Sequence, residues 1–442
     1  MNHPNILFLF SDQQRWDTLG CYNPAMDFTP HLDRLAAEGA RFEHAFTCQP
    51  VCGPARSCLQ TGLYATQTGC YRNGIPLRPT APTLADHFHE NGYETAYIGK
   101  WHLACTGDQP VPPELRGGYR DYWLAADTLE FTSTGLEGGY MFDTQNRKVE
   151  FGGYRVDRQT GFVLDYLYNR ESDRPFFLFV SWLEPHHQNA AKHYQGPPGS
   201  KERFRDYPIP EDLRALGGGD WAREYPDYLG CCASLDANVG RIVQALKELG
   251  EYENTLIVYT SDHGSHFKTR NGEYKRACHE SCVRVPMLLR GPGFSGGQII
   301  DKMASLIDLP VTLLHAAVID APTGWQGNAL QRLTAGDRES WPQEAFIQVS
   351  ETQVGRALRT AKWKYSVRAP GRNGWLHSSA KVYREDFLYD LENDPHELRN
   401  LVRDSAYGEV RAGLRGRLIE RMVAAGEKEP VILGRRSRAR RR

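Results

Sequence analysis

The chain has 442 residues, of which 40% are hydrophobic and 24% charged, and its formal net charge is −1. This length predicts one large domain with a smaller one, and the near-neutral charge argues against nucleic acid or an acidic membrane surface as a partner. No apolar stretch approaches the length of a membrane span, and the run Ile6 to Phe10 is too short for a secretory signal. We therefore expect a cytoplasmic protein whose ten cysteines are reduced.

The first three quarters of the chain alternate between strand and helix patterns. Continuous apolar runs typical of strands buried on both faces occupy residues 5–10, 95–98, 176–182, 254–261 and 286–289. Helical periodicity with fitting end signals covers residues 30–39, 84–91 and 234–249. This alternation predicts an α/β domain over residues 1–340, with a large, mainly parallel sheet sandwiched by helices.

The pattern changes after about residue 340. Short strand-like segments at 345–349, 356–360, 363–367 and 387–391 precede a helix at 407–424, which predicts a small C-terminal α+β subdomain of antiparallel strands over residues 341–434. Residues 435–442 are rich in arginine and are expected to form a basic, disordered tail. Residues 108–155 and 195–219 read as long irregular insertions, which usually shape the substrate site.

Polar side chains follow four of the predicted strands. They are Asp12 and Gln13, Lys100 and His102, His186 and His187, and Asp262 and His263. Ligands of open parallel sheets bind at the carboxyl ends of the strands. A single Asp in such a place is commonly only a helix cap. Four such groups at one edge favour a functional site.

The residue types at this edge indicate a metal ion. Asp12, Gln13, Asp262 and His263 offer mainly oxygen ligands, which suit a hard divalent cation, Ca²⁺ first, with Mg²⁺ or Mn²⁺ as alternatives. Zinc is the competing interpretation, because residues 48 and 52, and residues 278 and 282, are cysteines in C-x₃-C spacing. Free cysteine is commonly a small buried hydrophobe, so we rank structural zinc below the oxygen-rich site.

The segment C-G-P-A-R-S-C-L-Q-T-G at residues 52–62 resembles the signature C-x-P-[SA]-R-x-x-x-x-T-G of the formylglycine-dependent (type I) sulfatases of the alkaline phosphatase superfamily. The resemblance implies that a maturase oxidises Cys52 to formylglycine, that residue 52 also binds the metal, and that Arg56 holds its oxygens. A hydrated aldehyde can attack sulfur with one hydroxyl and expel sulfate by collapse of the other, which an alcohol or thiol cannot do. Pro54 predicts that residue 52 begins a helix, where an anion is favoured.

Further segments resemble the same family along nearly the whole chain. They are G-K-W-H-L at 99–103, E-P-H-H-Q at 184–188, T-S-D-H-G at 260–264 and L-Y-D-L-E-N-D-P at 388–395. The resemblance implies an alkaline-phosphatase-like fold and catalytic roles for Lys100, His102, His186 and Lys275. We expect the two lysines to offset charge around sulfur and His102 to act on the residue-52 diol. His186 is expected to protonate the leaving group, with Lys275 as its alternative.

Three departures from the family pattern border the site. Gln13 stands where many members have a second Asp, as in choline-sulfatase-like and phosphonate-monoesterase-like relatives. Gln188 replaces a usual proline and His279 a common tyrosine. Together with His187, these last two are predicted substrate contacts.

The leading prediction is a sulfuric ester hydrolase that acts on a sulfated small molecule or oligosaccharide, with no nucleic acid or membrane partner. The alternative is a phosphonate monoester hydrolase or phosphodiesterase of the same superfamily. A third interpretation is an unmatured homologue that only binds a sulfated ligand, against which the intact set of reactive residues argues.

Overall fold

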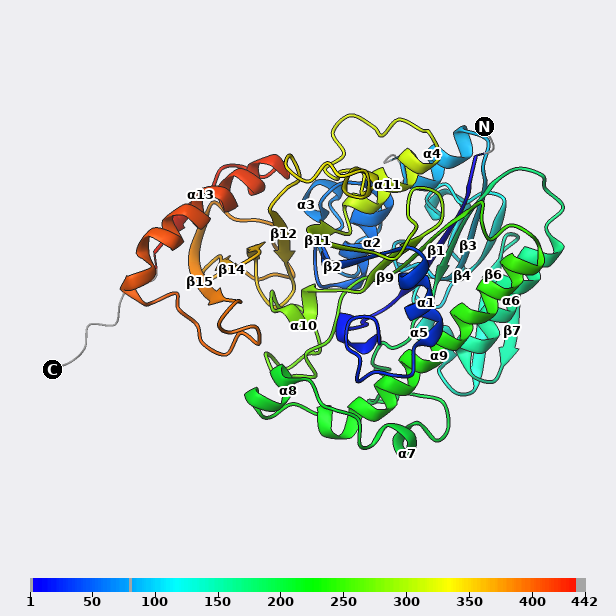
Figure 1. Cartoon of the computed structure of the whole chain (residues 1–442), viewed down its shortest axis with the longest axis horizontal. Coiled ribbons are helices and arrows are strands. Elements are labelled where there is room, and N and C mark those ends of the chain that lie inside the picture. Colours follow the sequence, from blue (N-terminus) through cyan, green and yellow to red (C-terminus); the bar gives the residue numbers. More distant parts are fainter. Residues whose placement is uncertain (1–2, 79–81, 435–442) are drawn as a thin grey trace.

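The computed structural model describes residues 3–78 and 82–434 as two packed parts, a large α/β part and a smaller C-terminal part (Figure 1). The predicted basic tail, residues 435–442, lies outside the described residues. No helix of the described residues is long and apolar enough to cross a membrane.

Four parallel strands form the centre of the 11-stranded main sheet. They lie in the order β9 (Thr255–Ser261), β1 (Asn5–Ser11), β8 (Phe176–Ser181) and β3 (Glu94–Lys100). Every residue of these strands is buried. Their register aligns Phe10 with both Ser181 and Thr260, so the carboxyl ends of the strands lie level. This geometry brings the segments that follow the strands to one edge.

Successive residues of the central strands supply two hydrophobic cores, because side chains alternate across a sheet. Phe8 belongs to one core and Leu9 to the other. The first core is covered by α2 (Cys52–Thr61), α4 (Leu84–Glu90) and α11 (Asp308–Ala316). The second is covered by α1 (Pro30–Glu38), α6 (Arg155–Asn169) and α9 (Trp221–Glu248). Each fully buried Leu or Phe stabilises the fold by about 1.5–3 kcal/mol.

The outer strands differ more from the sequence prediction. On one side, β10 (Met287–Arg290) runs antiparallel between β9 and β2 (Ala40–Phe46), and β11 (Gln298–Ser305) forms the edge. The sequence analysis missed β2 and β11, which mix charged with apolar residues.

The expectation that residues 108–155 are an irregular insertion was wrong. This segment extends the main sheet with β4 (Tyr122–Ala126), β5 (Ser133–Thr134), β6 (Gly138–Asp143) and β7 (Lys148–Gly152). The strands are short, and glycines such as Gly138 and Gly139 break the apolar pattern where neighbouring backbones approach closely.

The segment before α9 also contains more helix than predicted. α7 (Ser200–Phe204) and α8 (Glu211–Leu216) interrupt residues 195–219, and α9 begins 13 residues before the predicted start at Ser234. Pro226 lies inside α9 and hid its first turns, since proline normally ends a helical pattern. The remaining short helices are η1 (Trp16–Thr18), α3 (Ala65–Thr68), η2 (Pro113–Leu115), α5 (Leu129–Thr132), α10 (Glu280–Val283), α12 (Gln331–Thr334) and η3 (Ser405–Tyr407).

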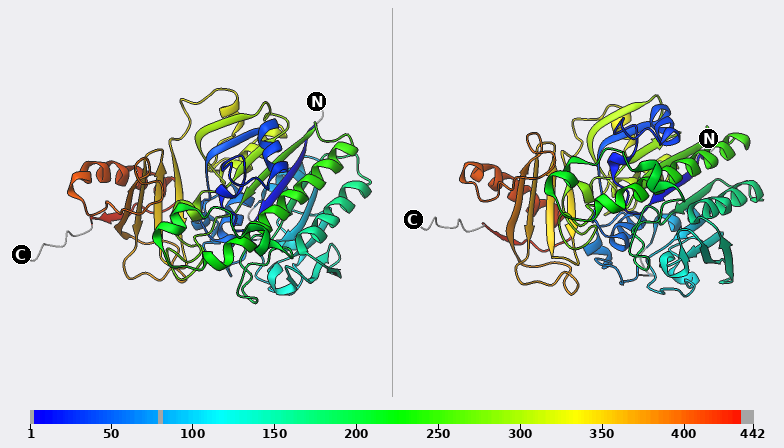
Figure 2. Two further views of the ribbon diagram at one scale, coloured as in Figure 1. Left: turned by 60° about the horizontal axis from the view of Figure 1, so that its bottom comes forward. Right: turned by 90° about the horizontal axis from the view of Figure 1, so that it is seen from below.

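The C-terminal part is a five-stranded sheet with one long helix (Figure 2). Its strands lie in the order β12 (Glu344–Val349), β13 (Gly355–Thr360), β14 (Trp363–Arg368), β15 (Val382–Asp390) and β16 (Val431–Leu433), and α13 (Gly408–Ala424) covers one face. The pairs from β12 to β15 are antiparallel, as predicted, while β16 adds in parallel. The predicted fold class is confirmed.

The two parts share one hydrophobic core. Phe346 of β12 and Tyr365 of β14 belong to the same cluster of buried side chains as Phe8 of β1. Tyr64, which precedes α3, packs edge-on against Phe346 with ring centroids 5.1 Å apart. The C-terminal sheet is therefore held against the segment that follows α2.

Candidate active site

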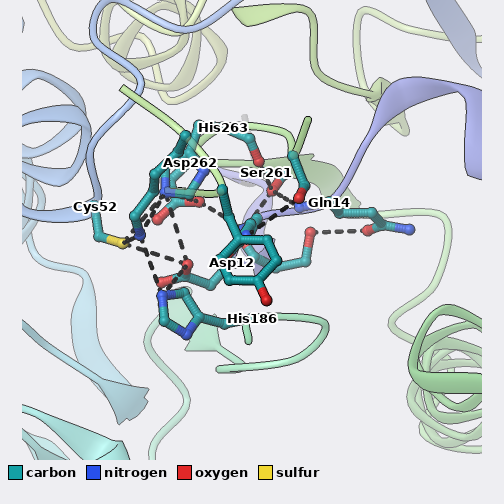
Figure 3. A network of polar contacts seen from close by, with 12 residues as sticks. Asp12, Gln14, Cys52, His186, Ser261, Asp262 and His263 are labelled. Atoms are coloured by element: carbon teal, nitrogen blue, oxygen red, sulfur yellow. Dashed lines mark hydrogen bonds and ion pairs between the residues drawn. The ribbon is translucent and has the colours of Figure 1, made fainter. Parts of the chain in front are cut away.

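Three strand ends and one helix start converge at the carboxyl edge of the main sheet (Figure 3). Asp12 follows β1, His186 follows β8, and Asp262 and His263 follow β9. Cys52 is the first residue of α2. All five side chains are buried. The structure thus brings together residues that are up to 251 positions apart in the sequence.

The Cys52 sulfur is surrounded by charged and polar groups. Its Sγ atom lies 2.8 Å from Lys275 Nζ, 3.2 Å from His263 Nε2 and 3.4 Å from Asp12 Oδ1. His102 adds a hydrogen bond to the sulfur. Although burial opposes ionisation, Lys100, Lys275 and His263 hold the pKa of the Cys52 thiol well below its ordinary value. We call Cys52, Asp12, Asp262, His263, Lys100 and Lys275 the Cys52 cluster.

The donor atoms of this cluster fit one divalent cation. One ligand atom from each of Asp12, Cys52, Asp262 and His263 lies within 4.8 Å of the others. Asp262 Oδ2 is buried without a hydrogen-bond partner, and the Arg56 guanidinium lies 3.7 Å from it, so a closer cation would stabilise it. Burial, followed by repulsion from the Asp12 carboxylate, raises the pKa of Asp262 to about 7. A bound cation would relieve both costs, so these residues fit the divalent metal that the sequence predicts.

Two cations hold the other oxygen of Asp12. Lys100 Nζ lies 2.6 Å from Asp12 Oδ2, and the Arg56 guanidinium lies 3.0 Å from the same oxygen. Although burial opposes ionisation, Lys100, His186 and Lys275 together keep the pKa of Asp12 below its ordinary value. Arg56 also donates to Ser181 Oγ and to the Lys100 carbonyl oxygen. Arg56 and Lys100 therefore fix Asp12 with its Oδ1 atom toward Cys52.

Lys275 and His186 lie next to each other beside the sulfur. Lys275 Nζ is 3.1 Å from His186 Nε2 and 3.2 Å from His263 Nε2, and no carboxylate of the described residues forms an ion pair with it. His266 and Asn271 both contact the Lys275 carbonyl oxygen and so fix the backbone of this residue. Burial, followed by the Lys275 charge, lowers the pKa of His186. The pair can exchange a proton directly.

Gln13 lies at the site, but its side chain turns toward a neighbouring network. Its amide nitrogen donates to Tyr194 Oη at 3.0 Å and Ser265 Oγ at 3.3 Å. Its amide oxygen accepts only a long 3.4 Å bond from the His187 backbone, which leaves this oxygen available to a metal. The ligand role of Gln13 stays a prediction.

The three predicted substrate contacts have different surroundings. His187 stacks on Tyr274 with ring centroids 4.3 Å apart, and both of its ring nitrogens lack partners. Gln188 accepts from Arg155 and donates to the His186 carbonyl oxygen, so a substrate contact would have to break these bonds. His279 packs against Phe387 and Tyr389 of β15. Of the three residues, only His187 has every polar side-chain atom without a hydrogen-bond partner.

Sequence reasoning missed several residues that support the site. Glu130 of α5 places its carboxylate 3.9 Å from His186 Nδ1. Although burial opposes ionisation, His186, Lys100 and Lys275 lower the pKa of this carboxyl. Asn73 accepts from the backbone N–H of Gly53, the residue after Cys52. Glu130 lies in the segment taken as irregular and Asn73 in a loop, so no strand end or motif marked them.

The alternative zinc site does not form within the described residues. All ten cysteines are free, and the one group of metal-binding side chains is that of Asp12, Cys52, Asp262 and His263. Cys278 and Cys282 are buried in a hydrophobic cluster between the two parts of the molecule. They behave as small apolar residues there.

Comparison with protein families gives two matches that together span most of the chain. The sulfatase family model matches residues 4–319, and the model of the N-sulphoglucosamine sulphohydrolase C-terminal region matches residues 272–424.

Individual relatives match over nearly full length. An uncharacterized sulfatase, YidJ, of Escherichia coli is 30% identical, covering 96% of this chain and 88% of its own. An N-acetylglucosamine-6-O-sulfatase of Bacteroides thetaiotaomicron is 23% identical, covering 97% and 88%. Among solved structures, a putative sulfatase of Bacteroides fragilis superposes with a TM-score of 0.79 at 26% identity, covering 96% of each chain. A phosphonate monoester hydrolase of Agrobacterium radiobacter superposes with a TM-score of 0.71 at 23% identity, again covering 96% of each.

Proposed function

The chain belongs to the sulfatase family and is a sulfuric ester hydrolase, and we propose that it removes sulfate from a sulfated carbohydrate through a formylglycine made from Cys52. The observation that carries this proposal is the Cys52 cluster. Residue 52 is buried at the start of a helix, and Lys275, His102 and His263 surround its sulfur. These groups would bind and activate the hydroxyls of a formylglycine at this position. The similarity to a protein named as an N-acetylglucosamine-6-O-sulfatase supports the substrate class.

The hydrated aldehyde would supply two hydroxyls, one to attack sulfur and one to expel sulfate by collapse to the carbonyl. His102 hydrogen-bonds residue 52 and can take the proton that this collapse releases. Its backbone N–H donates to the Asp127 carbonyl oxygen at 2.8 Å, which fixes the backbone of His102 just after β3. A formylglycine-generating maturase is the partner that this chemistry requires.

We propose Ca²⁺ as the cation, held by Asp12, Asp262, His263 and residue 52, with Gln13 as an additional oxygen ligand. The two buried carboxylates, with the Gln13 amide oxygen, form an oxygen-rich set that suits a hard cation, and Mg²⁺ or Mn²⁺ are the alternatives. A cation bound there would polarise a sulfate oxygen and favour ionisation of the nucleophile.

Lys100 and Lys275 would stabilise the charge that develops on the oxygens around sulfur. Both ammonium groups are buried, where a positive charge acts more strongly than in water. Lys100 is bound to Asp12, whereas Lys275 has no carboxylate partner among the described residues. Lys275 is therefore the cation of the pair that is free to bind a substrate oxygen.

The leaving alkoxide of a sugar needs a proton, for which His186 is our first choice and Lys275 the second. Because the two nitrogens are 3.1 Å apart, a proton can pass between them, and either residue can then donate it to the leaving oxygen. Burial, followed by the Lys275 charge, lowers the pKa of His186, and Lys275 can supply a proton to the imidazole through this contact. Glu130, on the far nitrogen of His186, would orient the ring.

Phosphonate monoester or phosphodiester hydrolysis is the second candidate, favoured by the structural likeness to the phosphonate monoester hydrolase and by Gln13 at the second metal position. The decisive experiment measures the matured enzyme on nitrophenyl sulfate, a panel of sulfated saccharides, a phosphonate monoester and a phosphodiester. A sulfate ester should give the highest kcat/KM. A phosphonate or phosphodiester that is turned over faster would overturn the sulfatase proposal in favour of the alternative.

A further inference from the structure

Trp375 is an aromatic side chain at the surface of the C-terminal part. It lies in the loop between β14 and β15, and 44% of its surface is exposed. All nine tryptophans of the chain lie within the described residues, and Trp375 alone among them is an exposed one. An exposed indole offers a large rigid face at little entropic cost, which is a common feature of binding sites.

Two guanidinium groups lie near the Trp375 ring without stacking closely on its face. The Arg72 and Arg276 guanidinium carbons lie 5.8 Å and 5.9 Å from the ring centroid. Both distances are near the outer limit of about 6 Å for a cation–π contact. Elsewhere in the chain Arg284 stacks on Trp16 at 3.5 Å, which does occupy that ring. The Trp375 ring is therefore left open to a ligand.

The two arginines differ in how their charges are balanced. Arg276 forms ion pairs with Glu351 and Glu273. Arg72 forms no ion pair within residues 3–78 and 82–434. One of its N–H groups donates to the Asn73 carbonyl oxygen at 2.8 Å, and its Nε atom is buried without a partner. A buried, unsatisfied donor on an unbalanced cation favours an acidic ligand group.

Direct contacts connect these side chains to the Cys52 cluster. Arg72 precedes Asn73, whose Oδ1 atom accepts from the Gly53 backbone at 2.9 Å. Arg276 follows Lys275, and its backbone N–H donates to the Pro50 carbonyl oxygen at 3.2 Å. Arg72 and Arg276 are thus each one residue from a side chain that contacts residue 52 or its neighbour.

Glu351 holds the three segments together. Its buried carboxylate accepts from the Asn73 backbone and from Arg276, and its own N–H donates to the Gly374 carbonyl oxygen. Gly374 immediately precedes Trp375. The arrangement of Arg72, Arg276 and Trp375 is therefore built into the fold before any ligand binds.

A cavity of about 400 Å³ adjoins this group, lined by Arg276, Gln353 and Arg368 among others. That volume lies within the usual range of small-molecule sites, about 300–1,000 Å³. The Gly374 backbone packs against Gln353, so the cavity and the Trp375 loop are neighbours. The cavity offers space on the Arg276 side of the Trp375 loop for a further part of a saccharide.

We propose that Arg72, Arg276 and Trp375, the Trp375 subsite, bind a second acidic group of a saccharide whose sulfate ester lies at Cys52. This inference rests on the proposed function and narrows its substrate to a polyanionic saccharide. Trp375 packs against the apolar face of a sugar ring, and Arg72 pairs with a second sulfate or with a uronate carboxylate. The charge of Arg276 is already balanced by Glu273 and Glu351, so this residue lines the pocket and does not supply the main charge for the ligand.

The test measures kcat and KM of the matured enzyme, and of its Trp375→Ala and Arg72→Gln variants, on nitrophenyl sulfate and on three saccharides. These are a monosulfated sugar, its disulfated form and a monosulfated disaccharide that contains a uronate. The saccharides are also assayed as competitive inhibitors of nitrophenyl sulfate hydrolysis, so a slow substrate still gives an affinity.

Trp375→Ala should weaken all three saccharides by about tenfold in KM or Ki while kcat stays within about twofold. Trp375→Phe should restore most of the loss. Arg72→Gln should weaken only the disulfated or the uronate-containing ligand, by roughly fivefold to tenfold, and whichever is affected identifies the second acidic group. Nitrophenyl sulfate should change by less than about twofold in both variants. Leu376→Ala and Arg372→Gln, exposed neighbours in the same loop, serve as matched controls.

Three results would overturn the subsite. One is an equal loss on nitrophenyl sulfate and saccharides, which would indicate a structural effect. Another is unchanged saccharide affinity in both variants. The last is a wild-type enzyme that hydrolyses nitrophenyl sulfate but binds the disulfated and uronate-containing ligands no more tightly than the monosulfated sugar. Failure of the matured wild type on every sulfate ester would instead reject the proposed function.

Discussion

The side chains around Cys52 and those around Trp375 are held by different parts of the chain. The Cys52 cluster is buried and most of its members end strands of one parallel sheet, so their positions depend on the main core. The Trp375 subsite takes its members from three loops of both parts of the molecule, joined through Glu351. The comparison suggests that the chemistry is fixed by the sheet, while the choice of substrate can vary through the loops.

Replacing the nucleophile should have the largest effect. Cys52→Ala should reduce turnover of every sulfate ester by at least about 10⁴-fold, because no other group can form and release the sulfated intermediate. Mass spectrometry of the active wild type should show an aldehyde at residue 52. Cys58→Ala, in the same helix but facing the core, should keep most activity. Full activity with an unmodified thiol at residue 52 would contradict the mechanism.

Removing the metal should come next. Chelation or Asp262→Asn should lower kcat by about 10³-fold on aryl and sugar sulfates alike, since the charge that the cation offsets is common to both. Circular dichroism should show that the fold is retained, and metal analysis should show loss of one ion per chain. If Asp262→Asn kept both the metal and a near-normal rate, the ligand assignment would be withdrawn.

Loss of the general acid should separate substrates by their leaving groups. His186→Ala should slow a sugar sulfate by about 10²–10⁴-fold but nitrophenyl sulfate by less than about tenfold, because nitrophenolate leaves without a proton. The ratio of kcat values for the two substrates is the measurement. Equal slowing of both would move the role to Lys275, whose own variant should then show the leaving-group dependence.

The smallest effect on chemistry is expected at the junction between the two regions. Glu351→Gln keeps a hydrogen-bond acceptor for Asn73 but removes the charge that pairs with Arg276. We expect an increase of about threefold to tenfold in KM for acidic saccharides, with little change in kcat on nitrophenyl sulfate. The paired measurement distinguishes a displaced subsite from a damaged reaction centre. A larger loss of kcat on nitrophenyl sulfate would show that Glu351 supports the Cys52 cluster itself.

The grouping of side chains around Cys52 was largely predictable because most of these residues follow apolar strand runs or lie in a specific motif, while their catalytic roles stay predictions. Asp12 and Asp262 mark the ends of β1 and β9, and the 52–62 segment marks the start of α2. Glu130 and Trp375 were not predictable in the same way. Glu130 reaches His186 across 56 positions and Arg72 reaches Trp375 across 303, and nothing local encodes such contacts. The outer strands of the sheet, such as β6, were missed because they are short and interrupted by glycine. These strands are stabilised by pairing with neighbouring strands, which the local sequence pattern does not reveal.

The hydrophobic core that joins β1 to β12 and β14 has a consequence for how the molecule comes apart. Two domains with separate cores can melt one after the other, whereas a continuous core couples them into one cooperative unit. Heating should therefore give a single calorimetric transition in which the C-terminal sheet and the catalytic edge are lost together. A chain cut before Glu344 would expose the core side chains that Phe346 and Tyr365 now cover, and it would tend to aggregate rather than persist as a smaller enzyme.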